Sequence, residues 1–140
     1  MASNTQFSIA VHLMTGLGYD SSSKGKTSGE LSASVNACPS FVRRVVSKLS
    51  KAKLVKTTTG KSGACSLAKN PKQISLLDIY EAVEAPKAFA IHDYPVQKQC
   101  SISCNIKGSM ERVLDQTQHS LEETLKKITL ADVISDVKKV

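Results

Sequence analysis

The chain has 140 residues and a formal net charge of +7 at pH 7, with 41% hydrophobic and 22% charged residues. This length suits one domain with an appended element, and the apolar content excludes wholesale disorder. No apolar run approaches the roughly 18 residues of a membrane span, and the N-terminal segment lacks the features of a secretory signal. We therefore expect a cytoplasmic protein without a membrane partner.

The positive charge is concentrated in one segment. Residues 31–77 contain nine Lys and Arg but neither Asp nor Glu, whereas the remaining residues carry a net charge of −2. A concentrated positive field suggests a polyanionic partner, either nucleic acid or an anionic membrane surface. The alternative is a basic surface that is merely solvated.

The first 36 residues predict two helices. Apolar residues recur with helical spacing from Phe7 to Leu17, and Gly16 and Gly18 are expected to end this helix. After a polar loop, the Thr27-Ser-Gly-Glu30 sequence predicts a capping box that starts a short second helix.

Pro39 is suited to the first position of a third helix. The polar residues of this helix fall largely off one apolar stripe. The stripe consists of Val42, Val45, Val46 and Leu49. Two short helices joined by a tight turn, the second basic on its free side, indicate a helix-turn-helix. Residues 54–59 and 64–67 are expected to form a hairpin around residues 60–63, which makes the unit a winged helix.

A helix over residues 74–83 is expected to be followed by a connector over residues 86–105 and a long helix over residues 106–128. The long helix has a 4-3-4-3-4 seam typical of subunit pairing. The alternative is that it packs only on its own domain. The seam contains Met110, Leu114, Thr117, Leu121, Thr124 and Ile128. Thr129 and Asp132 predict a capping box before a short last helix.

The order of these motifs resembles the Rrf-two family of bacterial winged-helix transcription regulators, the class of IscR, NsrR and CymR. Seven matching stretches cover nearly the whole chain in the family's order: residues 7–10, 28–31, 39–44, 48–55, 60–63, 74–79 and 128–132. The resemblance implies a homodimer on a palindromic operator in double-stranded DNA. It also implies that the second helix of the helix-turn-helix enters the major groove, the wing contacts the minor groove or the backbone, and the long helix forms the dimer interface.

Within this fold, Ser40, Arg43 and Arg44 are expected to contact base edges, because the N-terminal part of the recognition helix enters the groove and Arg suits guanine. The other expected DNA contacts are Ser47 and four lysines assigned to phosphates, for which a solvated surface charge is the alternative. The four lysines are Lys48, Lys51, Lys56 and Lys61.

The chain has four cysteines, whose thiols are candidates for sensing an oxidant or an electrophile. Cys38 precedes the recognition helix, whose N-terminus, together with Arg43 and Arg44, favours an oxidisable thiolate. Cys100 and Cys104 are expected in the connector, where they offer a disulfide with Cys38 of a second subunit, a bond with each other, or zinc binding with His92. Cys65, in a strand, is expected to be a packing residue.

No cofactor and no metal site is predicted. Family members that bind an iron–sulfur cluster have three cysteines before the long helix, and this chain has two. The wing also departs from the Gly-Gly-aromatic sequence of many members, since Gly63 is followed here by Ala64 and Cys65.

The expected fold class is mainly α with a small β wing: a winged helix-turn-helix domain over residues 1–85, the connector, and a dimerisation helix with a terminal helix over residues 106–140. The expected function is a DNA-binding transcription regulator, a repressor, that senses oxidants or electrophiles through thiols. An enzyme is not expected, because no phosphate loop or catalytic triad spacing is present. One alternative is a regulator that senses an iron–sulfur cluster, and another is a regulator that senses a small molecule in a pocket between the winged helix and the dimer helix, lined by aromatics such as Tyr80, Phe89 and Tyr94. A third is an adaptor that does not bind DNA. His12 is expected to be a packed histidine.

Overall fold

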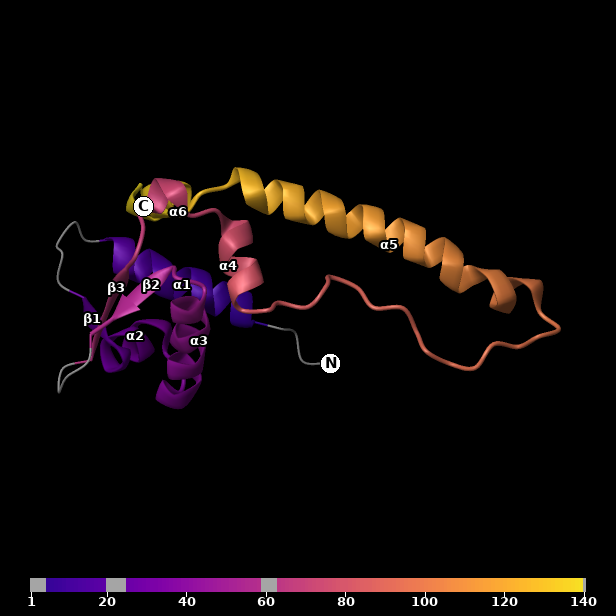
Figure 1. The fold of residues 1–140 in the computed structure, drawn as a ribbon, viewed down its shortest axis with the longest axis horizontal. Coiled ribbons are helices and arrows are strands. Elements are labelled where there is room, and N and C mark those ends of the chain that lie inside the picture. The colour runs from indigo at the N-terminus through magenta and orange to yellow at the C-terminus, as the bar shows by residue number, and fades with distance from the viewer. Residues whose placement is uncertain (1–4, 20–24, 59–62, 140) are drawn as a thin grey trace.

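The structure, a computed structural model, describes residues 5–19, 25–58 and 63–139. Its elements are α1 (Gln6–Tyr19), β1 (Lys26–Thr27), α2 (Ser28–Val35), α3 (Pro39–Lys51), β2 (Val55–Thr57), β3 (Ala64–Leu67), the 3-10 helix η1 (Pro71–Gln73), α4 (Leu76–Ala82), α5 (Ser101–Lys127) and α6 (Leu130–Lys138). All except α5 gather in one body, from which α5 projects as an arm (Figure 1). The connector runs out along this arm, and α5 leads the chain back to α6.

The helix-turn-helix is confirmed. The Thr27 hydroxyl accepts the backbone N–H of Glu30 and caps α2. Asn36 adopts the left-handed conformation, with φ 57°, and ends α2 at the expected turn. Pro39 then occupies the first turn of α3, where a missing N–H leaves no hydrogen bond unmade.

The sheet has one more strand than the predicted hairpin. Its order is β1-β3-β2 and both pairings are antiparallel, with Thr27 opposite Ala64 and Thr57 opposite Cys65. At Gly25, just before β1, a Cβ atom would lie 2.5 Å from the carbonyl oxygen of Cys65. Only glycine allows the chain to approach β3 this closely, so the segment before α2 can join the sheet.

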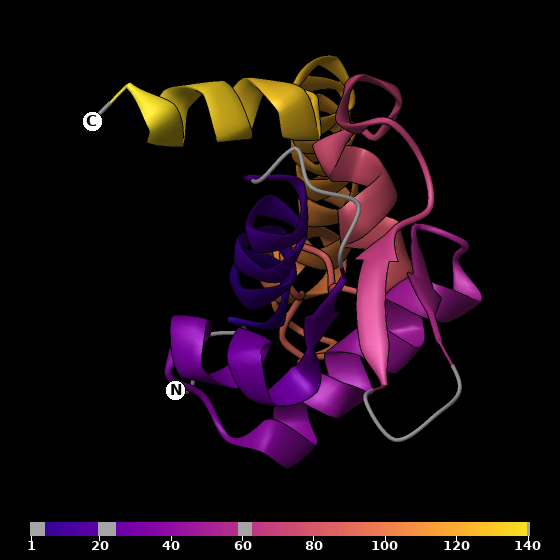
Figure 2. The same ribbon diagram turned by 90° about the vertical axis from the view of Figure 1, so that its left-hand side faces the viewer.

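The expectation that Gly16 and Gly18 end the first helix was wrong, because α1 continues to Tyr19. A Cβ atom at Gly18 would lie 2.6 Å from Cδ1 of Ile134 in α6. Gly18 therefore serves close packing of α6 on α1 rather than helix termination. Figure 2 shows α6 lying across α1 at the end of the body opposite α2 and α3.

The C-terminal helix α6 is part of the body and not of the arm. Leu130 and Ile134 belong to the buried core. Leu130 donates its N–H to Ile74 at 2.8 Å, and Leu76 donates to Ile128 at 2.8 Å, so the start of α6 is bonded to the start of α4. The Thr129–Asp132 capping box is present as predicted. The segment 106–140 is thus divided between arm and body.

The connector is shorter than expected. It ends at Cys100, which is the N-cap of α5, and Cys104 lies within the first turn of α5. The long helix therefore begins at Ser101 rather than at Ile106, because the N-cap at Cys100 starts it earlier than its apolar seam indicates. Among the described residues, no helix is long and apolar enough to span a membrane.

Candidate nucleic-acid interface

The third helix, α3, divides into a buried face and a polar face. Its apolar stripe is buried in the core, as the spacing predicted. The stripe consists of Val42, Val45, Val46 and Leu49. The other face exposes five of the predicted residues, Ser40, Arg43, Arg44, Ser47 and Lys51. Lys48 is half-buried. The stripe fixes α3 to the body and so holds its basic side toward solvent.

The small sheet extends this polar face. An open groove of about 400 Å³ lies between α3 and the strands β2 and β3. Arg43, Ser47 and Lys51 line it from α3, and Thr57 and Thr58 line it from the sheet side. Lys56, on β2, is exposed. The structure therefore brings three of the predicted residues together in one groove; Lys61, expected at the wing tip, lies outside the described residues.

Four hydroxyl residues that line this groove were not predicted as site residues, namely Ser28, Ser50, Thr57 and Thr58. Thr58 fixes the base of the wing, because its hydroxyl donates to the carbonyl of Ala64 at 3.2 Å and accepts the Ala64 N–H at 3.0 Å. Ser28, at the start of α2, also lines the groove. Hydroxyl residues are common on every surface, and only the packing of the sheet against α3 identifies these.

Arg44 lies off the groove, over the ring of Phe41 at 5.5 Å from its centroid. Such a cation–π contact holds the guanidinium near the start of α3. The first turn also holds Cys38 and Ser40, whose Sγ and Oγ atoms are 3.1 Å apart.

Cys38 is exposed, and its pKa is lowered from the ordinary value of a thiol. The main cause is the hydrogen bond with the Ser40 hydroxyl, followed by the backbone N–H groups of Ser40 and Phe41 and the charge of Arg44. Each of these stabilises the thiolate. By contrast, Cys65 is buried as expected, and desolvation raises the pKa of its thiol.

The other two cysteines are engaged with the start of α5. Cys100 accepts the N–H of Ser103 at 3.5 Å, and the Cys104 thiol faces the carbonyls of Gln97 at 3.8 Å and Lys98 at 3.5 Å. In the described part of the chain, no three His, Cys, Asp or Glu side chains gather as metal ligands, so His92 does not join these thiols. Two thiols of one chain do not fit an iron–sulfur cluster, which takes four ligands.

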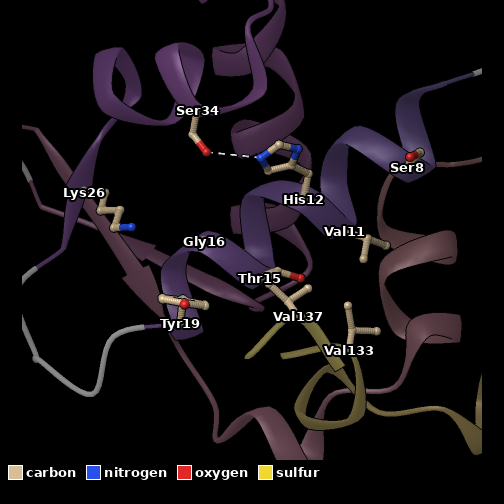
Figure 3. Close-up of a pocket in the computed structure, with 10 residues that line it drawn as sticks. All are labelled: Ser8, Val11, His12, Thr15, Gly16, Tyr19, Lys26, Ser34, Val133 and Val137. Atoms are coloured by element: carbon tan, nitrogen blue, oxygen red, sulfur yellow. Dashed lines mark hydrogen bonds between the residues drawn. The ribbon is translucent and has the colours of Figure 1, made fainter. Parts of the chain in front are cut away.

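The aromatic pocket of the alternative small-molecule sensor is not formed, and His12 is not packed in the core. Phe89 lines a cavity beside α5, whereas Tyr94 is exposed and Tyr80 packs edge to face against Phe7. His12 is exposed and its Nε2 lies 3.1 Å from the Ser34 hydroxyl (Figure 3). Its apolar neighbours in the sequence indicated a buried position, but the side chain lies on the polar edge of α1.

The helix-turn-helix, the three-stranded wing sheet and the exposed basic face of α3 together define a winged-helix transcription regulator. The model of one such family, Rrf2, described as "Iron-dependent Transcriptional regulator", matches residues 3–136. The chain belongs to this Rrf2 family, whose members are transcription regulators and not enzymes.

Individual relatives agree with this membership. The chain is 35% identical over 134 residues to YwnA of Bacillus subtilis (strain 168), whose name describes an HTH-type transcriptional regulator; the match covers 94% of this chain and 96% of the relative. A solved structure of a transcriptional regulator from Lactobacillus plantarum is similar with a TM-score of 0.78 and 25% identity, over 97% of this chain and 91% of that one. IscR of T. potens shares the fold, with a TM-score of 0.72 and 22% identity, over 98% and 88% of the two chains.

Proposed function

We propose that this protein is a sequence-specific regulator that binds a palindromic operator in double-stranded DNA as a homodimer and represses transcription. The observation that carries the proposal is the exposed polar face of α3, continuous with a groove to the wing sheet. Its basic residues belong to the acid-free segment, so positive charge is presented where a DNA backbone would lie.

The position of each residue on α3 supports a division of roles. Ser40, Arg43 and Arg44 lie in its first two turns, the part of a recognition helix that contacts base edges. Ser47, Lys48 and Lys51 follow toward its C-terminus, and Lys56 lies on β2, so we assign them with Lys61 to phosphates.

The arm supports the dimer. α5 has 27 residues and is therefore about 40 Å long, yet Gln118 is its only buried residue. Ile102 and Val113 are 73% and 50% exposed. A helix that projects from its own body with apolar side chains uncovered (Figure 1) is suited to packing against the same helix of a second copy.

The first turn of α3 supports regulation through a thiol. Cys38 is exposed, its pKa is lowered, and it adjoins residues that we assign to base contact. Modification by an oxidant or electrophile would add bulk or charge where the helix meets DNA. Cys100 and Cys104 of a second subunit are the proposed disulfide partners of Cys38.

Fluorescence anisotropy with labelled DNA from upstream of the gene tests the DNA-binding proposal. We expect tight binding to one segment, with an affinity that falls steeply as salt rises. Arg43→Ala should weaken specific binding by about 1–3 kcal/mol. Arg112→Ala, which removes the same charge from an exposed position of α5, should have little effect.

Equal affinity for all DNA sequences, or equal losses in the two Arg variants, would contradict the proposal and favour the adaptor. Transcription from the same upstream segment, measured with and without the protein, distinguishes repression from activation.

A further inference from the structure

We propose that Thr58 is a positioning residue for DNA binding: its hydroxyl group fixes the end of β2 to β3 and thereby sets the place of Lys56 against the DNA backbone. Thr58 follows β2 directly, and it lines the groove between α3 and the sheet. The inference rests on the proposed function, in which Lys56 contacts a phosphate.

The contact between Thr58 and Ala64 departs from the regular ladder of the sheet. β2 and β3 pair as far as Thr57 and Cys65, so the next pair along the ladder is Thr58 and Ala64. In a hydrogen-bonded antiparallel pair, each residue donates its N–H to the carbonyl of the other. Thr58 donates its N–H to the Ala64 carbonyl at 2.9 Å, but Ala64 donates its N–H to the Thr58 hydroxyl oxygen at 3.0 Å. The hydroxyl therefore takes the place of a backbone carbonyl.

The Thr58 hydroxyl also donates to the Ala64 carbonyl at 3.2 Å. Two of the three hydrogen bonds that join these residues thus depend on one side-chain oxygen. β2 has only three residues, so few other ladder bonds hold its end. Thr58 is exposed, and water can bond to the backbone groups when the hydroxyl is removed. Loss of the hydroxyl should therefore loosen the end of β2 without unfolding the sheet.

The position of Ala64 is set from its other side by the helix-turn-helix. Ala64 pairs with Thr27 of β1, and α2 begins at the next residue, Ser28. At Gly25, a Cβ atom would lie 3.0 Å from Cβ of Ala64, so the chain before β1 lies close against β3. The Thr58 hydroxyl thus attaches β2 to a strand that is itself attached to the helix-turn-helix.

Lys56 depends on this attachment, because it lies on β2 two residues before Thr58 and opposite Ser66 of β3. Its side chain is exposed. A lysine of the wing meets a phosphate only if the wing keeps its place while α3 lies in the major groove. A loosened β2 would weaken this ionic contact and leave the base contacts of α3 unchanged.

The salt dependence of binding to the upstream DNA, measured by fluorescence anisotropy, tests this role. Thr58→Val keeps the shape of the side chain but lacks the hydroxyl. It should bind about tenfold more weakly at about 50 mM salt, and the slope of log affinity against log salt should fall in magnitude by about 1, the value for one phosphate contact. Its preference for the operator over unrelated DNA and its thermal unfolding should match the wild type.

Two single variants are the controls. Thr58→Ser retains the hydroxyl and should bind as the wild type does. Ser66→Ala also removes a hydroxyl from the wing sheet, but Ser66 does not line the groove and makes no side-chain hydrogen bond within the described part of the chain. It should change neither the affinity nor the slope. In the double variant Thr58→Val/Lys56→Ala the two losses should not add, because Thr58 acts through Lys56.

Amide hydrogen exchange followed by NMR measures the contact itself in the absence of DNA. The Ala64 N–H should exchange faster in Thr58→Val than in the wild type, and Thr58→Ser should restore the slower rate. Equal exchange in the three proteins would show that the hydroxyl does not hold this end of β2.

The inference also fails if Thr58→Val binds like the wild type, if it loses the same factor at every salt concentration, or if its loss adds fully to that of Lys56→Ala. A wild type with equal affinity for all DNA contradicts only sequence-specific regulation, because the salt slopes still report on a phosphate contact. A wild type that binds no DNA overturns both proposals.

Discussion

Cys38 is the residue at which the chemistry of a thiol and the geometry of the recognition helix coincide. Because the Ser40 hydroxyl is the largest cause of its lowered pKa, the thiolate should persist at a pH below the ordinary thiol value of about 8.5. We expect the alkylation rate of Cys38 by iodoacetamide, followed by peptide mass spectrometry, to show its inflection below that value. Ser40→Ala should move the inflection upward.

Ser47→Ala is a matched control, since it removes a hydroxyl from the same face of α3 two turns away. An unchanged inflection in Ser40→Ala, or an ordinary one in the wild type, would remove the basis for a reactive thiolate. Cys65, buried and with a raised pKa, should alkylate slowly in the same digest.

If Cys38 is the sensor, oxidant should weaken DNA binding by the wild type but not by Cys38→Ser. A dimer-sized band on a non-reducing gel would identify the intersubunit disulfide.

At the scale of elements, one polar side chain links the arm to the body through hydrogen bonds. Gln118 accepts the Ala88 N–H at 3.0 Å and donates to the Tyr80 hydroxyl at 3.0 Å, while Tyr80 donates to the Pro86 carbonyl at 2.7 Å. α4, the connector and α5 thus meet at one hydrogen-bonded point.

Gln118→Leu should lower the free energy of unfolding by about 1–3 kcal/mol, because it leaves the Ala88 N–H without its partner. Urea denaturation followed by circular dichroism measures the loss, and limited proteolysis should cut the connector faster. Gln116→Leu, at an exposed position of the same helix, should change neither. Equal stability of the two variants would show that this point does not hold the arm.

The elements differ in how far the sequence could predict them. The stripe of α3 and the Thr129 cap depend on residues close together in the chain, and both predictions were correct. β1 and the packing of Gly18 against Ile134 depend on segments far apart, and local patterns cannot encode them. The role of Gln118 was not predicted either, because its partners Ala88 and Tyr80 are far away in the chain. A polar residue on a long helix is ordinarily solvated.

The candidate interface was similarly predictable in part. The acid-free segment and the spacing of α3 located the exposed residues Arg43, Ser47 and Lys51. The pocket between α1, α2 and α6 (Figure 3) could not be predicted, because these helices meet only in the folded chain.

At the scale of the whole molecule, the arm is explained if two copies pair along α5. Val113 is half exposed and lies one turn from both Met110 and Thr117 of the predicted seam. Val113→Asp would then place a carboxylate in the helix pair, at a cost of about 3 kcal/mol, which corresponds to a rise in the dimer dissociation constant of about 100-fold. Sedimentation velocity across a dilution series measures this constant.

His119→Asp adds the same charge at an exposed position that lies further along α5 and about 120° around the helix axis from Val113, and it should leave the dimer intact. Because two half-sites are read together, the monomeric variant should also lose most of its affinity for a palindrome while its α3 remains unchanged. A Val113→Asp protein with the same dimer dissociation constant as the wild type would mean that α5 is not the interface. A wild type that sediments as a monomer at all concentrations would mean that the apolar residues of the arm are covered by something other than a second copy.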